Sequence, residues 1–393
     1  MHRMTRLAAA AAAICLILGL GRGAVAADPF DVYAVLPLTG NNAFSGNAAK
    51  EGLAGYQTVV NATGGIKGRP LNFVYQDSQA SPQIAVQLTT DILTKHPSLI
   101  IGDTSVAGCN AMAPMFKANG PVEFCLSPGY RPEKGGYSYT IGLSAIDEAK
   151  AIFRFLREKG WDRIALLVGT DATGRLAEPE FAEVAALPEN HDTSIVTVEH
   201  FNPTDVTIAA QVARMRAART QVVIVWVNGS PFGTALRSMK DAALSLPVVG
   251  VTGNLSYPEL HTFADAVPSQ LYFCWTAVPA SGQPVPNGPR KPMQTAYAQT
   301  FDKLGIKPEY GQAAAWDTAI VAVAALRALG TDATPDQIRT YVNGIHGLAG
   351  VQSAFDFRDG EMRGIPVSAA RILLWDKTKE TWYLASGPGG SKL

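Results

Sequence analysis

The sequence predicts an α/β protein made of two doubly wound, parallel-sheet lobes joined by a multi-strand hinge. Short runs rich in Val, Ile and Leu alternate with helical stretches, and this order repeats through most of the chain. The runs are apolar at consecutive positions, which indicates parallel strands covered by helices on both faces. The 393 residues are enough for two domains with separate cores.

The first 26 residues have the order of a secretory signal peptide. Arg3 and Arg6 precede an uncharged run from Leu7 to Leu20, and small residues follow up to Ala26. The apolar run is shorter than the roughly 20 residues that a membrane-spanning helix needs. We therefore expect cleavage after Ala26 and export to the periplasm.

The charge balance excludes strongly charged partners. The chain carries 33 basic and 33 acidic residues, and the predicted signal peptide contains three of the basic ones and none of the acidic ones. The remaining net charge of about −3 favours neither nucleic acid nor an anionic membrane surface.

The first lobe is predicted from strands that are each followed by a helix. We expect strands at 32–36, 71–75, 99–101 and 122–126, and helices at 47–60, 82–93 and 108–117.

The second lobe repeats this pattern. We expect strands at 164–168, 194–198, 222–227, 248–251 and 271–275, and helices at 146–159, 174–186, 206–218, 233–243 and near Glu259.

The last third of the chain changes character after a Pro/Gly-rich loop at 280–289. Helices at 293–304, 310–329 and 334–343 have no strands between them, so we expect them to return to the first lobe, whereas strands at 371–375 and 381–385 cross to the second. The predicted division is a signal peptide at 1–26, a first lobe at 27–145 plus 278–348, and a second lobe at 146–277 plus 349–393. Several crossings give a hinge rather than a loose linker.

The cysteines leave two alternatives open. Cys109 and Cys125 are 16 residues apart in a chain predicted to be exported, where a disulfide is allowed. The sequence does not give the distance between their Cα atoms, so a disulfide and two free thiols both remain. Cys274 is expected to be a small buried side chain.

A series of short motifs runs through the chain in a fixed order. These motifs are Pro37-Leu-Thr-Gly40 with Ser45-Gly46, Asn61-Ala-Thr-Gly-Gly-Ile-Lys-Gly-Arg-Pro-Leu71, Asp77, Leu126-Ser-Pro128 with Pro132, Asp171 to Gly174, and Tyr310 with Trp316-Asp317. Together they resemble the branched-chain amino-acid (Leu/Ile/Val-type) ABC transporter substrate-binding proteins, which have the type I periplasmic binding fold. The resemblance implies two lobes that close on a small molecule and then dock onto the membrane permease of an ABC importer.

Candidate ligand-binding residues follow the predicted strands, because ligands of open α/β sheets lie beyond the carboxyl ends of the strands. They are Phe44, Ser45, Ser105, Val106, Gly129, Tyr130, Arg131, Thr173, Phe232, Asn254 and Trp275. The resemblance implies that the loops at 105–106 and 129–131 hold a ligand carboxylate. Ser105 either only caps the following helix or both caps and binds.

Three positions favour an organic acid without an amine, and one of them is Thr173, which stands where the resemblance implies a tyrosine. Arg131 offers a carboxylate two parallel hydrogen bonds, while Asn254 stands where the resemblance implies an acid for the ligand ammonium and offers no charge. An aromatic or apolar acid could be enclosed by four aromatic side chains, Phe44, Tyr130, Phe232 and Trp275. Alternatively, Phe232 and Trp275 are core residues.

Two alternatives remain open. An amino acid or small amide fits if another acid, such as Glu259, reaches the cleft. A sensory receptor that presents its ligand to a signalling partner fits the same fold.

An enzyme, a metal site and a cofactor are not expected. The six histidines show no metal-ligand spacing, and the sequence contains no G-x-S-x-G, H-E-x-x-H or phosphate-loop pattern. We expect a monomer that performs no covalent chemistry.

Overall fold

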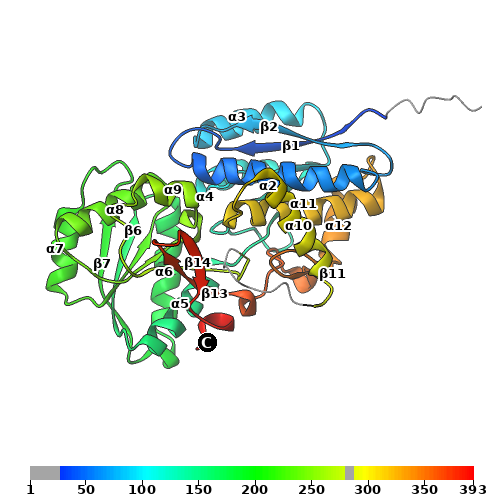
Figure 1. The fold of residues 1–393 in the computed structure, drawn as a ribbon. Coiled ribbons are helices and arrows are strands. Elements are labelled where there is room, and N and C mark those ends of the chain that lie inside the picture. Colours follow the sequence, from blue (N-terminus) through cyan, green and yellow to red (C-terminus); the bar gives the residue numbers. More distant parts are fainter. Residues whose placement is uncertain (1–26, 279–286) are drawn as a thin grey trace, which may run out of the picture.

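The computed structural model describes residues 27–278 and 287–393, in which two separate sheets lie side by side (Figure 1). The predicted signal peptide and most of the Pro/Gly-rich loop lie outside the described residues. We call the part built on the first sheet the first lobe and the part built on the second sheet the second lobe.

The first sheet is entirely parallel and has the order β2-β1-β3-β4-β5. Its strands are β1 (Phe30–Leu36), β2 (Leu71–Asp77), β3 (Leu99–Ile101), β4 (Val122–Cys125) and β5 (Ser138–Thr140). The helices between them are α2 (Ala43–Ala62), α3 (Pro82–Leu93) and α4 (Val106–Met112). The sequence analysis missed β5, because a Ser-Tyr-Thr segment with polar ends forms no apolar run.

The second sheet has the order β14-β13-β10-β9-β8-β6-β7. Its parallel strands are β6 (Arg163–Gly169), β7 (Ser194–Phe201), β8 (Val222–Trp226), β9 (Val248–Gly250) and β10 (Leu271–Trp275), and β13 (Arg371–Asp376) and β14 (Thr381–Leu384) add to it antiparallel. Its helices are α5 (Ala145–Lys159), α6 (Ala172–Ala185), α7 (Ala209–Ala217), α8 (Ser230–Asp241) and α9 (Tyr257–Thr262). The second lobe is therefore a mixed sheet rather than a copy of the first.

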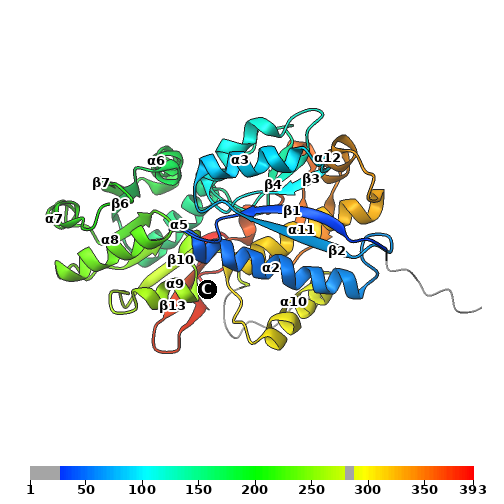
Figure 2. The same ribbon diagram turned by 90° about the horizontal axis from the view of Figure 1, so that it is seen from above.

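Three later helices return to the first lobe, as predicted, and Figure 2 shows α10 beside α2. They are α10 (Lys291–Leu304), α11 (Tyr310–Leu329) and α12 (Pro335–Asn343). The backbones of α2 and α11 approach closely, since a Cβ on Gly52 would lie 2.4 Å from the carbonyl oxygen of Gln312. By length and hydropathy α11 would pass for a membrane span, but it is mostly buried inside the protein and is a core helix.

One predicted boundary falls inside a hairpin. Strands β11 (His346–Ala349) and β12 (Ala354–Asp356) pair with each other, so a division at 348/349 would split β11. The residue after this hairpin, Phe357, packs its ring on Tyr139 of the first lobe. We therefore place the last passage of the chain from the first lobe to the second between Phe357 and Arg371, and keep the two-lobe division as a proposal.

Short 3₁₀ turns complete the described chain. They are η1 (Ala113–Met115), η2 (Pro188–Asn190), η3 (Thr252–Asn254), η4 (Arg358–Gly360), η5 (Val367–Ala369) and η6 (Pro388–Gly390).

Candidate functional site

A small cavity lies between the lobes, at the carboxyl ends of strands from both sheets. The first lobe contributes Ser45, Thr104, Val106 and Gly129, and the second contributes Glu148, Thr173, Trp226 and Asn228. Its volume is about 20 Å³, which is room for about one water molecule. The lobes are therefore closed on one another, and a ligand enters only when they separate.

The α4 loop on the first-lobe wall is held by its own hydrogen bonds. The Ser105 hydroxyl caps α4 by accepting from the Gly108 amide at 3.0 Å. The Asp103 carboxylate accepts from the Ser105 amide at 2.7 Å and from the Ser78 hydroxyl at 2.6 Å. Thr104 and Val106 line the cavity and Ser105 does not. Ser105 therefore caps α4, and its two neighbours face the cavity.

A disulfide ties the two first-lobe loops together. Cys109 in α4 is bonded to Cys125 at the end of β4, with 6.0 Å between their Cα atoms, which settles the alternative that the sequence left open. The buried Tyr130 ring packs against this bridge. Tyr130 therefore supports the loop from behind and is not the predicted aromatic wall of the cavity.

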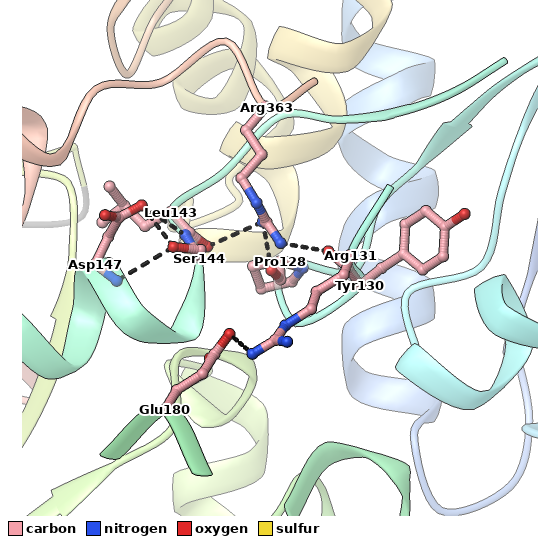
Figure 3. A network of polar contacts seen from close by, with 8 residues as sticks. All are labelled: Pro128, Tyr130, Arg131, Leu143, Ser144, Asp147, Glu180 and Arg363. Atoms are coloured by element: carbon pink, nitrogen blue, oxygen red, sulfur yellow. Dashed lines mark hydrogen bonds and ion pairs between the residues drawn. The ribbon is translucent and has the colours of Figure 1, made fainter. Parts of the chain in front are cut away.

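Arg131 does not face the cavity. Its guanidinium forms an ion pair with Glu180 of α6, and the two groups reach toward each other from opposite lobes (Figure 3). The Glu180 side chain is 8% exposed and that of Arg131 is 50% exposed. The predicted carboxylate ligand of Arg131 is thus replaced by a carboxylate of the protein, which holds the lobes together.

Arg363 braces the same loop from the C-terminal segment. It donates to the carbonyl oxygens of Pro128, at 2.8 Å, and of Tyr130 (Figure 3). Burial lowers the pKa of Arg363 to about 10, against the raising effect of Asp147 and other acids nearby. The loop at 128–130 is therefore fixed by backbone contacts that leave Gly129 on the cavity wall.

Two predicted binding residues, Phe232 and Asn254, belong to the interior of the second lobe. Phe232 packs between Phe263 and Phe273. Asn254 is fully buried, accepts from the Gly229 amide at 2.8 Å and donates to the Val227 carbonyl at 2.8 Å. These corrections have one cause: a residue that follows a strand can point down into the lobe as well as out of it.

The other predicted aromatic residues also lie off the cavity. Trp275 is fully buried, meets the Tyr310 ring edge to face at 4.8 Å and donates its indole N–H to Gln352. Phe44 is partly exposed and is absent from the cavity wall. Of the predicted set, Ser45, Val106, Gly129 and Thr173 line the cavity.

The sequence analysis missed the acid in the cavity, Glu148. This residue lies in the first turn of α5, which begins at a capping box formed by Ser144 and Asp147. Glu148 is 2% exposed, and its Oε2 accepts a hydrogen bond of 2.5 Å from the Thr252 hydroxyl. Within the described residues no hydrogen bond reaches its Oε1.

Burial controls the charge of Glu148. It raises the pKa of the carboxyl to about 8, while the Thr252 hydrogen bond and the positive charge of Arg363 act in the opposite direction. The empty cavity therefore holds a mostly protonated acid at neutral pH. A cation placed beside it would lower its pKa and ionise it.

Comparison with known proteins agrees with this architecture. A family model described as periplasmic binding protein matches residues 32–380. The chain belongs to the periplasmic binding protein family.

Groups of three or more His, Cys, Asp or Glu side chains arranged to hold a metal ion are absent from residues 27–278 and 287–393.

Proteins similar to this chain carry different ligands in their names. A leucine-, isoleucine-, valine-, threonine- and alanine-binding protein of Pseudomonas aeruginosa is 24% identical over 64% of this chain and 67% of its own. The branched-chain amino acid transporter substrate-binding protein LivJ of Streptococcus pneumoniae, in complex with isoleucine, has a TM-score of 0.77 at 18% identity, over 91% of this chain and 99% of its own. A fatty acid ABC transporter substrate-binding protein of Thermomonospora curvata has a TM-score of 0.75 at 16% identity, over 92% of both chains.

Proposed function

We propose that this chain, after removal of residues 1–26, is a periplasmic solute-binding protein that captures a small carboxylic acid bearing an amine, as amino acids do, and delivers it to an ABC importer. The observation that carries the proposal is Glu148, a buried acid on the wall of the interlobe cavity. This acid meets the condition under which the sequence analysis left amino acids open, although Glu148 and not Glu259 supplies it.

The amine end of the ligand would pair with Glu148. Among residues 27–278 and 287–393 no basic side chain lines the cavity, so an ammonium group there would face the Glu148 carboxylate. The positive charge of Arg363 acts on Glu148 from outside the cavity wall. The ring of Trp226 on the same wall adds a face that attracts cations. Binding then converts a protonated acid into a buried ion pair, which makes the affinity for amines rise with pH.

The carboxylate end would lie against the first lobe. Ser45 and Thr104 offer hydroxyl groups there, and Val106 begins α4. Backbone amides at such a helix start suit an anion. The amino-acid ligands in the names of the Pseudomonas and Streptococcus proteins support an acid that bears an amine as the ligand class.

A second candidate is the amine-free aromatic or apolar acid that the sequence favours. A protonated Glu148 supports it, because an un-ionised carboxyl donates a hydrogen bond to a ligand oxygen. Trp226 and Tyr310 would then provide the apolar walls. The substrate-binding protein of Thermomonospora curvata has the same fold, and its name gives a fatty acid, which has no amine, as the transported compound.

Matched pairs of ligands separate the two candidates. Leucine against 4-methylpentanoate, and phenylalanine against 3-phenylpropanoate, differ only by the amine, and their affinities are measured by calorimetry. We expect the amine-bearing member to bind at least tenfold more tightly, and Glu148→Gln to remove that preference. Tighter binding of the amine-free member in both pairs would establish the second candidate instead.

A further inference from the structure

A second, larger pocket lies at the hinge. Its volume is about 600 Å³, and it shares no lining residue with the cavity that contains Glu148. Its walls come from α10, from the segment Val351–Ser353 that follows the β11 strand, and from the η5–β13 region. Because α10 packs on α2 of the first lobe and β13 belongs to the second sheet, the pocket is bounded by both lobes.

Two arginines face this pocket without an acidic partner. Arg290 donates to the Val351 carbonyl at 3.1 Å, and Arg371 donates to the carbonyls of Ser368 and Ala370, both at 2.8 Å. Neither forms an ion pair within the described residues, and the remaining residues, 1–26 and 279–286, contain no Asp or Glu that could supply one. Burial, and then the positive charge of Arg290, lowers the pKa of Arg371.

The two acids nearest to these arginines, Asp302 and Asp317, form no ion pair with them within the described residues. Asp302 lines the pocket but is exposed. Asp317 is buried behind the Val351–Ser353 segment, where its two oxygens accept from the amides of Val351 at 2.6 Å and Gln352 at 2.9 Å. Burial raises the pKa of Asp317 to about 7, while hydrogen bonds from Val351 and Gln352 and the positive charge of Arg290 act in the opposite direction. Asp317 leaves Arg371 uncompensated.

Polar groups without partners line the same pocket. Among the described residues, the hydroxyl of Tyr297 and the Nε2 of Gln352 have no hydrogen-bond partner, although these residues are only 4% and 5% exposed. The orientation of the Gln352 amide is fixed, because its oxygen accepts from the indole N–H of Trp275, a group that only donates. The free end of Gln352 is therefore a donor, and unsatisfied buried donors are rare in proteins.

We propose that this hinge pocket binds a small oxyanion, a phosphate or a carboxylate, held by Arg290 and Arg371 with Gln352 and Tyr297 as further donors. Guanidinium groups pair with both kinds of oxyanion through parallel hydrogen bonds. The bound anion would touch both sides of the hinge and would remove the repulsion between the two arginines.

The test is titration of the purified chain with inorganic phosphate and, separately, with succinate, at constant ionic strength and without cleft ligand. We expect saturable binding of at least one of them with one site per chain. Arg290→Gln and Arg371→Gln should each weaken it tenfold or more, and Arg371→Lys should restore part of the loss. Arg237→Gln is the matched control, because Arg237 lies on α8, bonds only to the Thr262 carbonyl and is remote from the pocket lining.

Three results would overturn the proposal. One is the absence of saturable binding by both anions. Another is equal anion affinity of the two pocket variants and the Arg237→Gln control, which would show that the anion responds to the overall charge of the protein and not to this pocket. The third is loss of anion binding in Glu148→Gln, which would place the anion in the interlobe cavity. Retained affinity for the cleft ligand shows that the Arg290 and Arg371 variants are folded.

Discussion

Replacement of Arg131 by alanine distinguishes a bond across the lobes from a bond to the ligand. In the structure the guanidinium pairs with Glu180 of the other lobe, whose carboxylate is 8% exposed. Exposed ion pairs contribute about 0.2–1 kcal/mol, and truncating one partner of a buried pair costs about 2–5 kcal/mol. Since Arg131 is half exposed, we expect about 1–2 kcal/mol, or about 5-fold to 30-fold in the equilibrium between closed and open forms.

This change should lower ligand affinity by up to the same factor, because the ligand is held by the closed form and its apparent affinity scales with the fraction of closed protein. Glu180→Gln should lower affinity comparably, and the double variant should be no worse than either single one. Calorimetry measures the affinity, and small-angle scattering of the ligand-free protein should show a larger radius of gyration for each variant.

The matched control is Arg214→Ala. Arg214 is 56% exposed and pairs with the 5% exposed Glu199 within the second lobe, so its loss should reduce stability without changing ligand affinity. If Arg131→Ala abolished binding while Glu180→Gln bound normally, Arg131 would contact the ligand, and the interlobe bond inferred here would be wrong.

Three further predictions concern stability. Reduction of the Cys109–Cys125 bridge, checked by thiol titration, should lower the free energy of unfolding by about 3 kcal/mol; an unchanged melting temperature would contradict this. Burial raises the pKa of Glu123, Glu148, Glu259 and Glu309 to about 8, so between about pH 5 and pH 8 the folded chain binds more protons than the unfolded chain. Its unfolding free energy, measured with urea, should therefore fall as pH rises, by at least the roughly 1.4 kcal/mol of one pKa unit in one group, and a flat profile would refute it. Gly52→Ala should lower the free energy of unfolding by about 1–3 kcal/mol, because the added methyl group pushes α2 away from α11. Ala54→Leu, on the exposed face of α2, is the control and should change it little. Equal effects of the two variants would contradict the close approach of the helices.

Much of the fold follows from the sequence because the central strands β3, β8, β9 and β10 are buried at every position. The bounds of β3, β10, α3 and α11 coincide with the predicted ones, since each has a long apolar run or a clear capping residue. The sequence analysis missed β5 and the β11–β12 hairpin, because these strands of three or four residues form no clear apolar run.

The candidate site was harder to predict, and β5 explains part of the failure. Because that strand was missed, the loop after it was not inspected, and Glu148 lies just beyond it in α5. Of the residues chosen because they follow strands, Ser45, Val106, Gly129 and Thr173 line the cavity, and their contact with a ligand stays a prediction. Strand order could not show that Arg131 meets Glu180, because that contact depends on how the lobes close.

Proton release on ligand binding tests the role of Glu148 most directly. Calorimetric titration of leucine, or of whichever amino acid binds best, at pH 7 in buffers of different ionisation enthalpy gives the number of protons exchanged. The account predicts release of close to one proton, because the ammonium ionises a carboxyl whose pKa burial has raised to about 8, and no release from Glu148→Gln. Tight binding of the amino acid without proton release, or with the same release in Glu148→Gln, would contradict the assignment of Glu148 as the partner of the amine.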